Sequence, residues 1–182
     1  KIVQQRLKKG NMSTLNCKEE VLLAEKLVKL HPWSDQVRFA RSGGEANAIA
    51  IRIARAHTKK NKIAFCGYHG WHDWYLATNL KSKNNLNEHL LPGLKTGGVH
   101  KKLKDTIYPF RYNDFNGLKK LIKKYPDIGI IKMEVIRNEK PKNNFLKKVR
   151  NLDEKNNIIL IFDECTSGFR ECLGGIQKKY KV

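Results

Sequence analysis

A carboxylate at the end of an apolar run is the feature of this sequence that points most directly to chemistry. Residues 158–162 are all apolar, as is typical of a core strand in a parallel sheet, and Asp163 follows them directly. Ligands of such sheets bind at the carboxyl ends of the strands, and a buried carboxylate there needs a cationic partner. One such partner is the protonated ring nitrogen of a cofactor, and the alternative is a structural salt bridge or a helix cap.

A glycine turn supplies a second candidate, which would bind an anion. Ser42, Gly43 and Gly44 lie where a predicted strand, 37–40, gives way to a predicted helix, 45–57. Free N–H groups and the helix dipole favour a phosphate at such a helix start, and glycine lets the backbone approach closely. Ser42 also begins an S-x-x-E sequence, which is the spacing of a capping box, so the turn by itself does not separate phosphate binding from capping.

An aromatic tract, FCGYHGWHDWY at residues 65–75, follows the predicted strand 62–66. Its rings can stack on a planar ligand at the end of that strand, although the two tryptophans are more typical of core or interface packing. Two histidines and an aspartate in the tract raise the question of a metal. Because His69, His72 and Asp73 lack the spacing of a recognised zinc site, no metal is predicted.

The three candidates all fall at the carboxyl ends of predicted strands. A single ligand with a phosphate, a flat ring and a basic nitrogen would contact the glycine turn, the aromatic tract and the carboxylate together. Pyridoxal 5'-phosphate has these three parts. The sequence therefore predicts a site for this cofactor.

Strands alternate with amphipathic helices, which predicts an α/β fold of three layers, α/β/α, with a mainly parallel sheet. Residues 79–105 lack periodicity and contain proline and glycines, so we expect a long loop that covers a pocket or meets another subunit. No internal repeat or low-complexity linker is visible, and one domain is expected. The predicted helices are 17–30, 45–57, 114–125 and 144–155, and the predicted strands are 37–40, 62–66, 106–110, 128–135 and 158–162.

The composition is that of a globular chain with a strong positive charge. Its 182 residues are 40% hydrophobic and carry a formal net charge of +20. Because the lysines are scattered and no nucleic-acid motif accompanies them, a non-catalytic anion- or nucleic-acid-binding module is only the alternative function. The four cysteines have neither zinc nor disulfide spacing, which favours reduced thiols in a cytoplasmic protein. No stretch is long enough to span a membrane, so no membrane partner is predicted.

The motifs resemble those of the class III, fold-type I pyridoxal-phosphate-dependent aminotransferases, most closely the glutamate-1-semialdehyde aminomutase branch. The most specific is LIFDECTSGFRECLGG at 160–175. VRFARSGGEANAIAIRIAR, which begins at Val37, and GYHG at 67–70 add to it. A softer similarity lies in PFRYND at 109–114 and in the strand that ends at Glu134. Together these motifs spread the resemblance over most of the chain.

The resemblance implies a role for eight residues. An ionised Asp163 would keep the ring nitrogen protonated, so that the ring withdraws electrons from the substrate. Two departures stand out: Gly44 occupies a position where the family commonly has Thr or Ser, and the tract after Glu134 lacks the family's usual proline. The implied roles are phosphate binding by Ser42, Gly43 and Gly44, stacking on the ring by Tyr68, binding of the ring nitrogen by Asp163, packing on the other ring face by Cys165, orientation of neighbouring groups by His69 and support of the site by Glu134.

The resemblance also implies that the chain is an internal part of a longer enzyme. The chain begins at Lys1, and the family's Schiff-base lysine is expected about ten residues beyond Val182. Residues 1–182 would then be the central part of the cofactor-binding large domain, without the lysine region and the small C-terminal domain, and inactive alone. We expect a small amino or keto substrate and a homodimer at full length. Aminotransferase and aminomutase both stay open, although the aromatic tract favours an aminotransferase for a sugar or a small keto acid.

Overall fold

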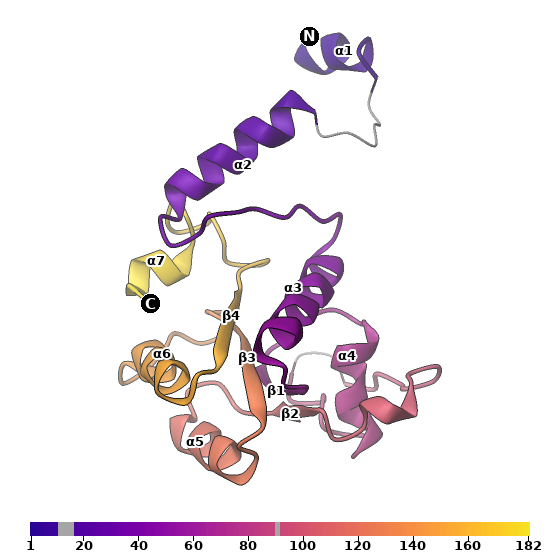
Figure 1. The fold of residues 1–182 in the computed structure, drawn as a ribbon, viewed down its shortest axis with the longest axis vertical. Coiled ribbons are helices and arrows are strands. Elements are labelled where there is room, and N and C mark those ends of the chain that lie inside the picture. Colours follow the sequence, from indigo (N-terminus) through magenta and orange to yellow (C-terminus); the bar gives the residue numbers. More distant parts are fainter. Residues whose placement is uncertain (11–16, 90–91) are drawn as a thin grey trace. The chain divides into compact units, whose positions relative to one another are not determined.

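The computed structural model of the chain describes residues 1–10, 17–89 and 92–182. These residues divide into two compact units, Lys1–Arg38 and Phe39–Val182. The first unit contains α1 (Ile2–Leu7) and α2 (Lys18–Leu30) (Figure 1). The helix predicted at 17–30 is confirmed, with Cys17 as its N-cap residue.

The second unit is built on a four-stranded sheet in which every neighbouring pair of strands is parallel. The strand order is β2-β1-β3-β4, so the central strands β1 and β3 each pair with a neighbouring strand on both sides. Because all strands run the same way, their carboxyl ends lie at one edge of the sheet. The strands are β1 (Lys62–Cys66), β2 (Ile107–Pro109), β3 (Ile128–Glu134) and β4 (Ile159–Asp163).

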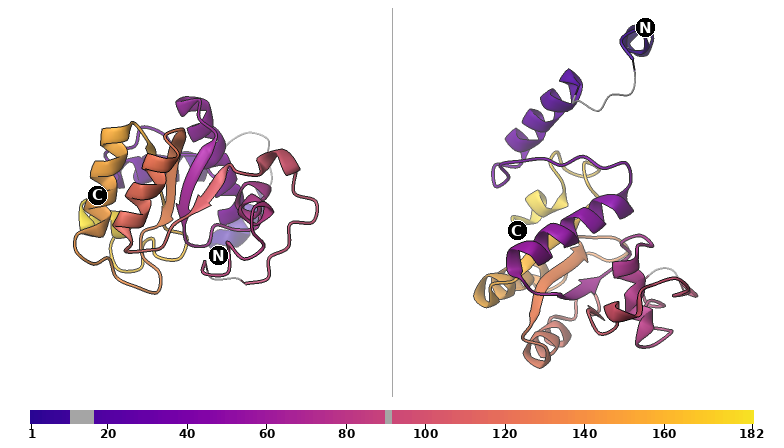
Figure 2. Two further views of the ribbon diagram at one scale, coloured as in Figure 1. Left: turned by 90° about the horizontal axis from the view of Figure 1, so that it is seen from below. Right: turned by 45° about the vertical axis from the view of Figure 1, so that its right-hand side comes forward.

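Helices cover both faces of the sheet, which confirms the predicted three-layer architecture. Alternate strand residues point to opposite faces, so Ile63 and Phe65 pack in a cluster with α3, while Ala64 and Met133 pack in a cluster with α5 and α6. Figure 2 shows α3 on one side of the sheet and α5 and α6 on the other. The covering helices are α3 (Gly43–Thr58) and α4 (Asp73–Leu76) on the first face and α5 (Phe115–Lys124) and α6 (Phe145–Asn156) on the second.

Local signals explain where the main helices begin and end. The Asp114 carboxylate caps α5 by accepting the N–H of Gly117 at 2.8 Å. Helix α3 ends at Thr58, and its C-cap residue Lys59 has a φ of 54°, the left-handed conformation typical of a helix end. A short helix, α7 (Ile176–Tyr180), closes the chain. None of the helices in the described ranges is long and apolar enough to cross a membrane.

Two sequence-based predictions differ from the structure. The predicted strand 37–40 is wrong, because no strand in the described part of the chain pairs with it and a lone extended segment forms no ladder. The predicted loop 79–105 is partly helical: η1 (Ala77–Leu80) runs into its start and η2 (Lys101–Leu103) lies near its end. Side-chain to backbone bonds hold this segment, such as Asn79 Nδ2 to the Leu94 carbonyl at 3.0 Å. Residues 90–91 lie outside the described residues.

Candidate functional site

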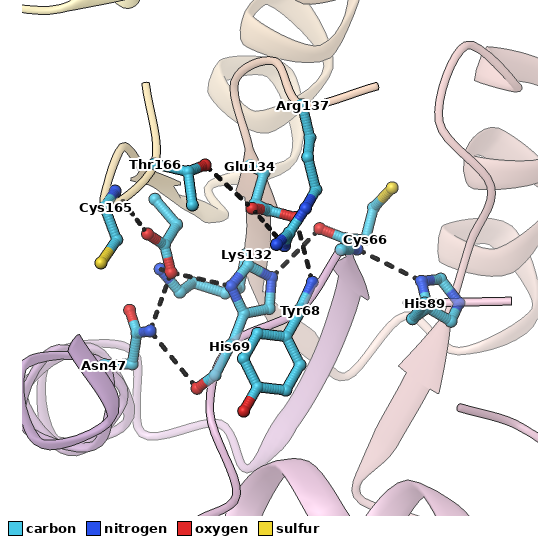
Figure 3. Close-up of polar contacts among 12 residues, drawn as sticks. Asn47, Cys66, Tyr68, His69, His89, Lys132, Glu134, Arg137, Cys165 and Thr166 are labelled. Carbon is cyan, nitrogen blue, oxygen red and sulfur yellow. Dashed lines mark hydrogen bonds and ion pairs between the residues drawn. The ribbon is translucent and has the colours of Figure 1, made fainter. Parts of the chain in front are cut away.

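A group of polar side chains collects at the carboxyl ends of β1, β3 and β4 and at the start of α3 (Figure 3). Glu134 and Asp163 are the last residues of neighbouring strands and are partners in the parallel register. Both carboxylates are buried. Each is held by cations and N–H groups, and the two environments differ.

The Asp163 carboxylate accepts four donors, which its two oxygens share unequally. Oδ2 lies 2.8 Å from Asn47 Nδ2, 2.9 Å from His69 Nδ1 and 3.3 Å from Lys132 Nζ. Among the described residues, Oδ1 has one donor, the backbone N–H of Cys165, at 3.0 Å. Because three donors surround Oδ2 and one contacts Oδ1, a further donor fits better at Oδ1. The site therefore offers a buried acceptor to a further N–H group.

The His69 ring is fixed between two acceptors. Its Nε2 lies 3.0 Å from the carbonyl oxygen of Cys66, and its Nδ1 lies 2.9 Å from Asp163 Oδ2. Burial lowers the pKa of His69, and the hydrogen bond with Asp163 opposes this effect. The two contacts therefore fix the orientation of the ring beside the carboxylate.

Neighbouring charges decide the ionisation of Asp163. Burial would raise its pKa, but the hydrogen bond from His69, the charge of Lys132 and the N–H of Cys165 hold that pKa well below its ordinary value. For Lys132 the order is reversed: burial lowers its pKa, and the carboxylates of Asp163 and Glu134 oppose the shift. The carboxylate of Asp163 is thus ionised before any ligand binds.

Glu134 is a structural anchor between the loops that follow β1 and β3. Its carboxylate accepts the backbone N–H of Tyr68 at 3.1 Å and Arg137 Nη1 at 2.9 and 3.1 Å, and Thr166 Oγ1 lies 3.5 Å away. Gly67 must be glycine here, since its φ is +106° and an added Cβ would lie 2.5 Å from Glu134 Oε2. Glu134 thereby sets the course of the backbone that carries Tyr68.

The predicted phosphate cradle lies at the first turn of α3. Ser42 Oγ accepts the N–H of Glu45 at 3.2 Å, so Ser42 is the N-cap residue of this helix. Glu45 in turn accepts the backbone N–H of Arg41 at 2.8 Å. The N-cap half of the predicted capping box is confirmed, while Glu45 accepts from Arg41 and not from Ser42. This cap does not conflict with phosphate binding, which would use other N–H groups of the same turn.

Glycines let three segments meet at this helix start. A Cβ on Gly43 would lie 3.0 Å from Cys165 Sγ, and a Cβ on Gly70, whose φ is +93°, would lie 3.0 Å from the Cα of Gly44. A Cβ on Gly44 would lie 2.9 Å from the ring of His72. His72 therefore fills the space that a side chain at position 44 would occupy.

The aromatic tract divides between core and surface. Trp74 and Tyr75 are buried, and the Tyr75 hydroxyl donates to the Gly67 carbonyl at 3.0 Å. Tyr75 thereby anchors the loop that follows β1. Trp71 is 70% exposed, so of the two tryptophans only Trp74 packs in the core, and interface packing of Trp71 stays a prediction. Tyr68 is half-buried and its ring lies 5.9 Å from the Arg137 guanidinium carbon. In the described residues, no group of three or more His, Cys, Asp and Glu side chains could hold a metal ion.

The structure brings the eight predicted residues to one edge of the sheet and adds two that sequence reasoning missed. Asn47 shares the buried side of α3 with Ile51 and Ala54, and this helical spacing was the available signal for it. Lys132 lies two residues before Glu134 in a strand that is otherwise apolar, so it points to the same face. That break in the apolar run was the signal for Lys132.

A cavity of about 340 Å³ lies beside this group of residues. It reaches from the end of β1 across to the loops that follow β2 and β3, and Tyr68 and Glu134 both line it. The ion pairs of Arg111 with Glu88 and of Arg137 with Glu134 contribute to its lining, beside Tyr68 and Tyr112. The lining therefore combines charged and apolar surface.

Comparisons with known proteins agree with this geometry. A family model for class-III aminotransferases matches residues 1–175. The chain is 36% identical over 188 residues to 3-aminobutyryl-CoA aminotransferase of Cloacimonas acidaminovorans, covering 100% of this chain and 41% of that protein. It is 40% identical over 187 residues to glutamate-1-semialdehyde 2,1-aminomutase of Francisella philomiragia, covering 99% and 42%. The structure of an omega-transaminase from Sphaerobacter thermophilus superposes with a TM-score of 0.83 at 29% identity, covering 99% and 43%.

Proposed function

This chain belongs to the class-III aminotransferase family, and we propose on that basis that it forms the cofactor-binding part of an enzyme that transfers amino groups. The family's cofactor is pyridoxal 5'-phosphate. The chain spans 41 and 42% of the length of two relatives named above. We propose that residues 1–182 are the central part of the large domain, and that the Schiff-base lysine and the small domain lie outside them. No lysine of this chain is assigned that role.

The observation that carries the proposal is the buried Asp163 carboxylate, at which a further donor fits better on Oδ1 than on Oδ2. When bound, the cofactor supplies an electron-withdrawing ring to the reaction. Asp163 would hold the proton on the ring nitrogen. Its ionised state suits this task, because an anion beside the nitrogen favours the protonated form.

The other residues would position the cofactor, and the structure fits such a ligand. The first turn of α3 offers N–H groups for a phosphate, and Gly43 and Gly44 add no side chain of their own to that turn. We propose that Ser42, Gly43 and Gly44 bind the phosphate and that Tyr68 and Cys165 flank the ring. His69 orients Asp163, and Glu134 fixes the loop that carries Tyr68.

The reaction we propose is transfer of an amino group on a small keto, aldehyde or amino-acid-like substrate. Relatives of both kinds are similar to this chain, an aminotransferase at 36% and an aminomutase at 40% identity, so both remain within the proposal. For the full-length protein we further propose a cytoplasmic homodimer, as the resemblance implies.

The test uses the full-length protein and pyridoxamine 5'-phosphate, whose binding is followed by calorimetry. Replacement of the ring-nitrogen partner by Asp163→Ala should weaken binding by about 100-fold, equivalent to about 2.7 kcal/mol. The matched control is Asp153→Ala, which removes another buried aspartate, one that pairs with Arg150 in α6 at 3.0 Å. Unchanged binding in Asp163→Ala, or an equal loss in Asp153→Ala, would refute the proposed role.

A further inference from the structure

Lys132 is the most deeply buried charged side chain at the site. It lies in β3 between Ile131 and Met133, and only 1% of its surface is exposed. Its Nζ lies 3.3 Å from Asp163 Oδ2. Lysine is almost never fully buried without a partner, and Asp163 supplies the counter-charge that Lys132 needs inside the sheet. Lys132 has no role in the cofactor binding proposed above.

The negative charge of Asp163 is already engaged by groups of the protein. Its Oδ2 lies 2.9 Å from His69 Nδ1 and 3.3 Å from the ammonium group of Lys132. The second anion nearby, Glu134, is engaged by Arg137 at 2.9 Å. A protonated ring nitrogen on Asp163 Oδ1 would bring a further positive charge into this buried space, where like charges repel more strongly than in water.

We propose that Lys132 is a positioning residue that competes with the cofactor's ring nitrogen for Asp163, and so weakens the binding of the protonated ring. This inference rests on the proposed function. Without cofactor, the ammonium group of Lys132 compensates the charge of Asp163 and stabilises the sheet. With cofactor bound, the same group would offset part of the effect by which Asp163 keeps the ring nitrogen protonated. The electron-withdrawing power of the ring is thereby tuned by a residue in the middle of a strand.

The proposal predicts opposite changes in stability and in affinity. Lys132→Met removes the positive charge but keeps a long apolar side chain. The cofactor-free protein should be less stable, because Asp163 loses a buried counter-charge. The affinity for a ligand with a protonated ring nitrogen should rise. A purely structural role would instead lower stability and affinity together.

The experiment compares two ligands on the full-length protein by calorimetry. One is pyridoxamine 5'-phosphate, and the other is its 1-deaza analogue, in which C–H replaces the ring nitrogen. Lys132→Met should bind pyridoxamine 5'-phosphate about tenfold more tightly than the wild type, as expected for removal of one nearby charge. Its affinity for the deaza analogue should stay unchanged. The matched control Lys132→Arg keeps the charge and should bind both ligands as the wild type does.

The outcomes separate this inference from the proposed function. If the wild type binds both ligands but Lys132→Met gains nothing for pyridoxamine 5'-phosphate, or gains equally for the deaza analogue, the inference is overturned and the cofactor site stands. If the wild type binds neither ligand, the proposed function itself fails. Should Lys132→Met not fold, Lys132→Gln takes its place in the same comparison. A gain in affinity confined to pyridoxamine 5'-phosphate supports the inference, and an unchanged affinity overturns it.

Discussion

Gly44 and His72 share a space that only one side chain can fill. A Cβ on Gly44 would lie 2.9 Å from the His72 ring. We expect Gly44→Ser to lower the free energy of unfolding by about 1–3 kcal/mol, the usual cost of overpacking. His72→Ala should make the serine tolerable, so that the double variant is more stable than the sum of the single changes predicts.

Urea denaturation of the full-length protein measures this coupling between the two positions. The four proteins of the cycle are the wild type, Gly44→Ser, His72→Ala and the double variant. Strictly additive losses would show that the His72 ring moves aside at no cost. In that case the absence of a hydroxyl at position 44 would need an explanation other than space.

The partners of Asp163 mark the limit of what single residues reveal in the sequence. A buried carboxylate at the end of an apolar run required a cation, and the structure supplies Lys132 at 3.3 Å. Its identity was not predictable, because it comes from a neighbouring strand whose register is fixed only by sheet assembly. The same holds for Asn47, which reaches Asp163 from the helix on one face of the sheet. Residue types indicated the chemistry, while the fold selected the partners.

The first turn of α3 combines capping with proposed phosphate binding, and one substitution can separate them. Ser42→Asp keeps a good N-cap side chain, so the free energy of unfolding should change by less than about 0.5 kcal/mol. Its negative charge should repel a phosphate and weaken binding of pyridoxamine 5'-phosphate by at least about 100-fold. Binding of pyridoxamine, which has no phosphate, should change little.

The companion variant is Ser42→Ala, which loses the bond to the Glu45 N–H. It should lose about 1 kcal/mol of stability and retain most of the affinity for the phosphate ligand. Chemical denaturation and calorimetry on the full-length protein give the two readouts. Tight binding of the phosphate ligand to Ser42→Asp would place the phosphate elsewhere.

Helices and strands were predictable where their signals are local. The helix predicted at 114–125 is observed at Phe115–Lys124, because its apolar stripe and the Asp114 cap are both within the segment. The strand predicted at 128–135 is observed at Ile128–Glu134. The segment 37–40 failed because a strand exists only with a neighbour, and no apolar pattern encodes whether that neighbour is present. The short 3₁₀ helices were not predicted either. Side-chain to backbone hydrogen bonds hold the segment that contains them, and such bonds leave no periodic pattern in the sequence.

The net charge of +20 belongs to the whole chain, and its effect can be tested apart from the site. Because the sequence carries no nucleic-acid motif, we expect only non-specific binding of oligonucleotides, weaker than about 1 µM at about 0.15 M salt. Fluorescence anisotropy of a labelled oligonucleotide across a salt series measures this. Submicromolar binding with a steep salt slope would favour a nucleic-acid-binding module over the enzyme we propose.

Asn47 and Asp163 share a hydrogen bond although 116 residues separate them in the chain. During synthesis at about 5–20 residues per second, roughly 6–23 s pass between the appearance of these two residues. Over that interval the first turn of α3 has been made, but the carboxylate that completes the site has not. Contacts so distant in sequence form late in folding, because the intervening chain must first be ordered. A cofactor that contacts both the start of α3 and Asp163 cannot bind during the early steps on the ribosome. Its binding would therefore indicate that β4 has joined the sheet.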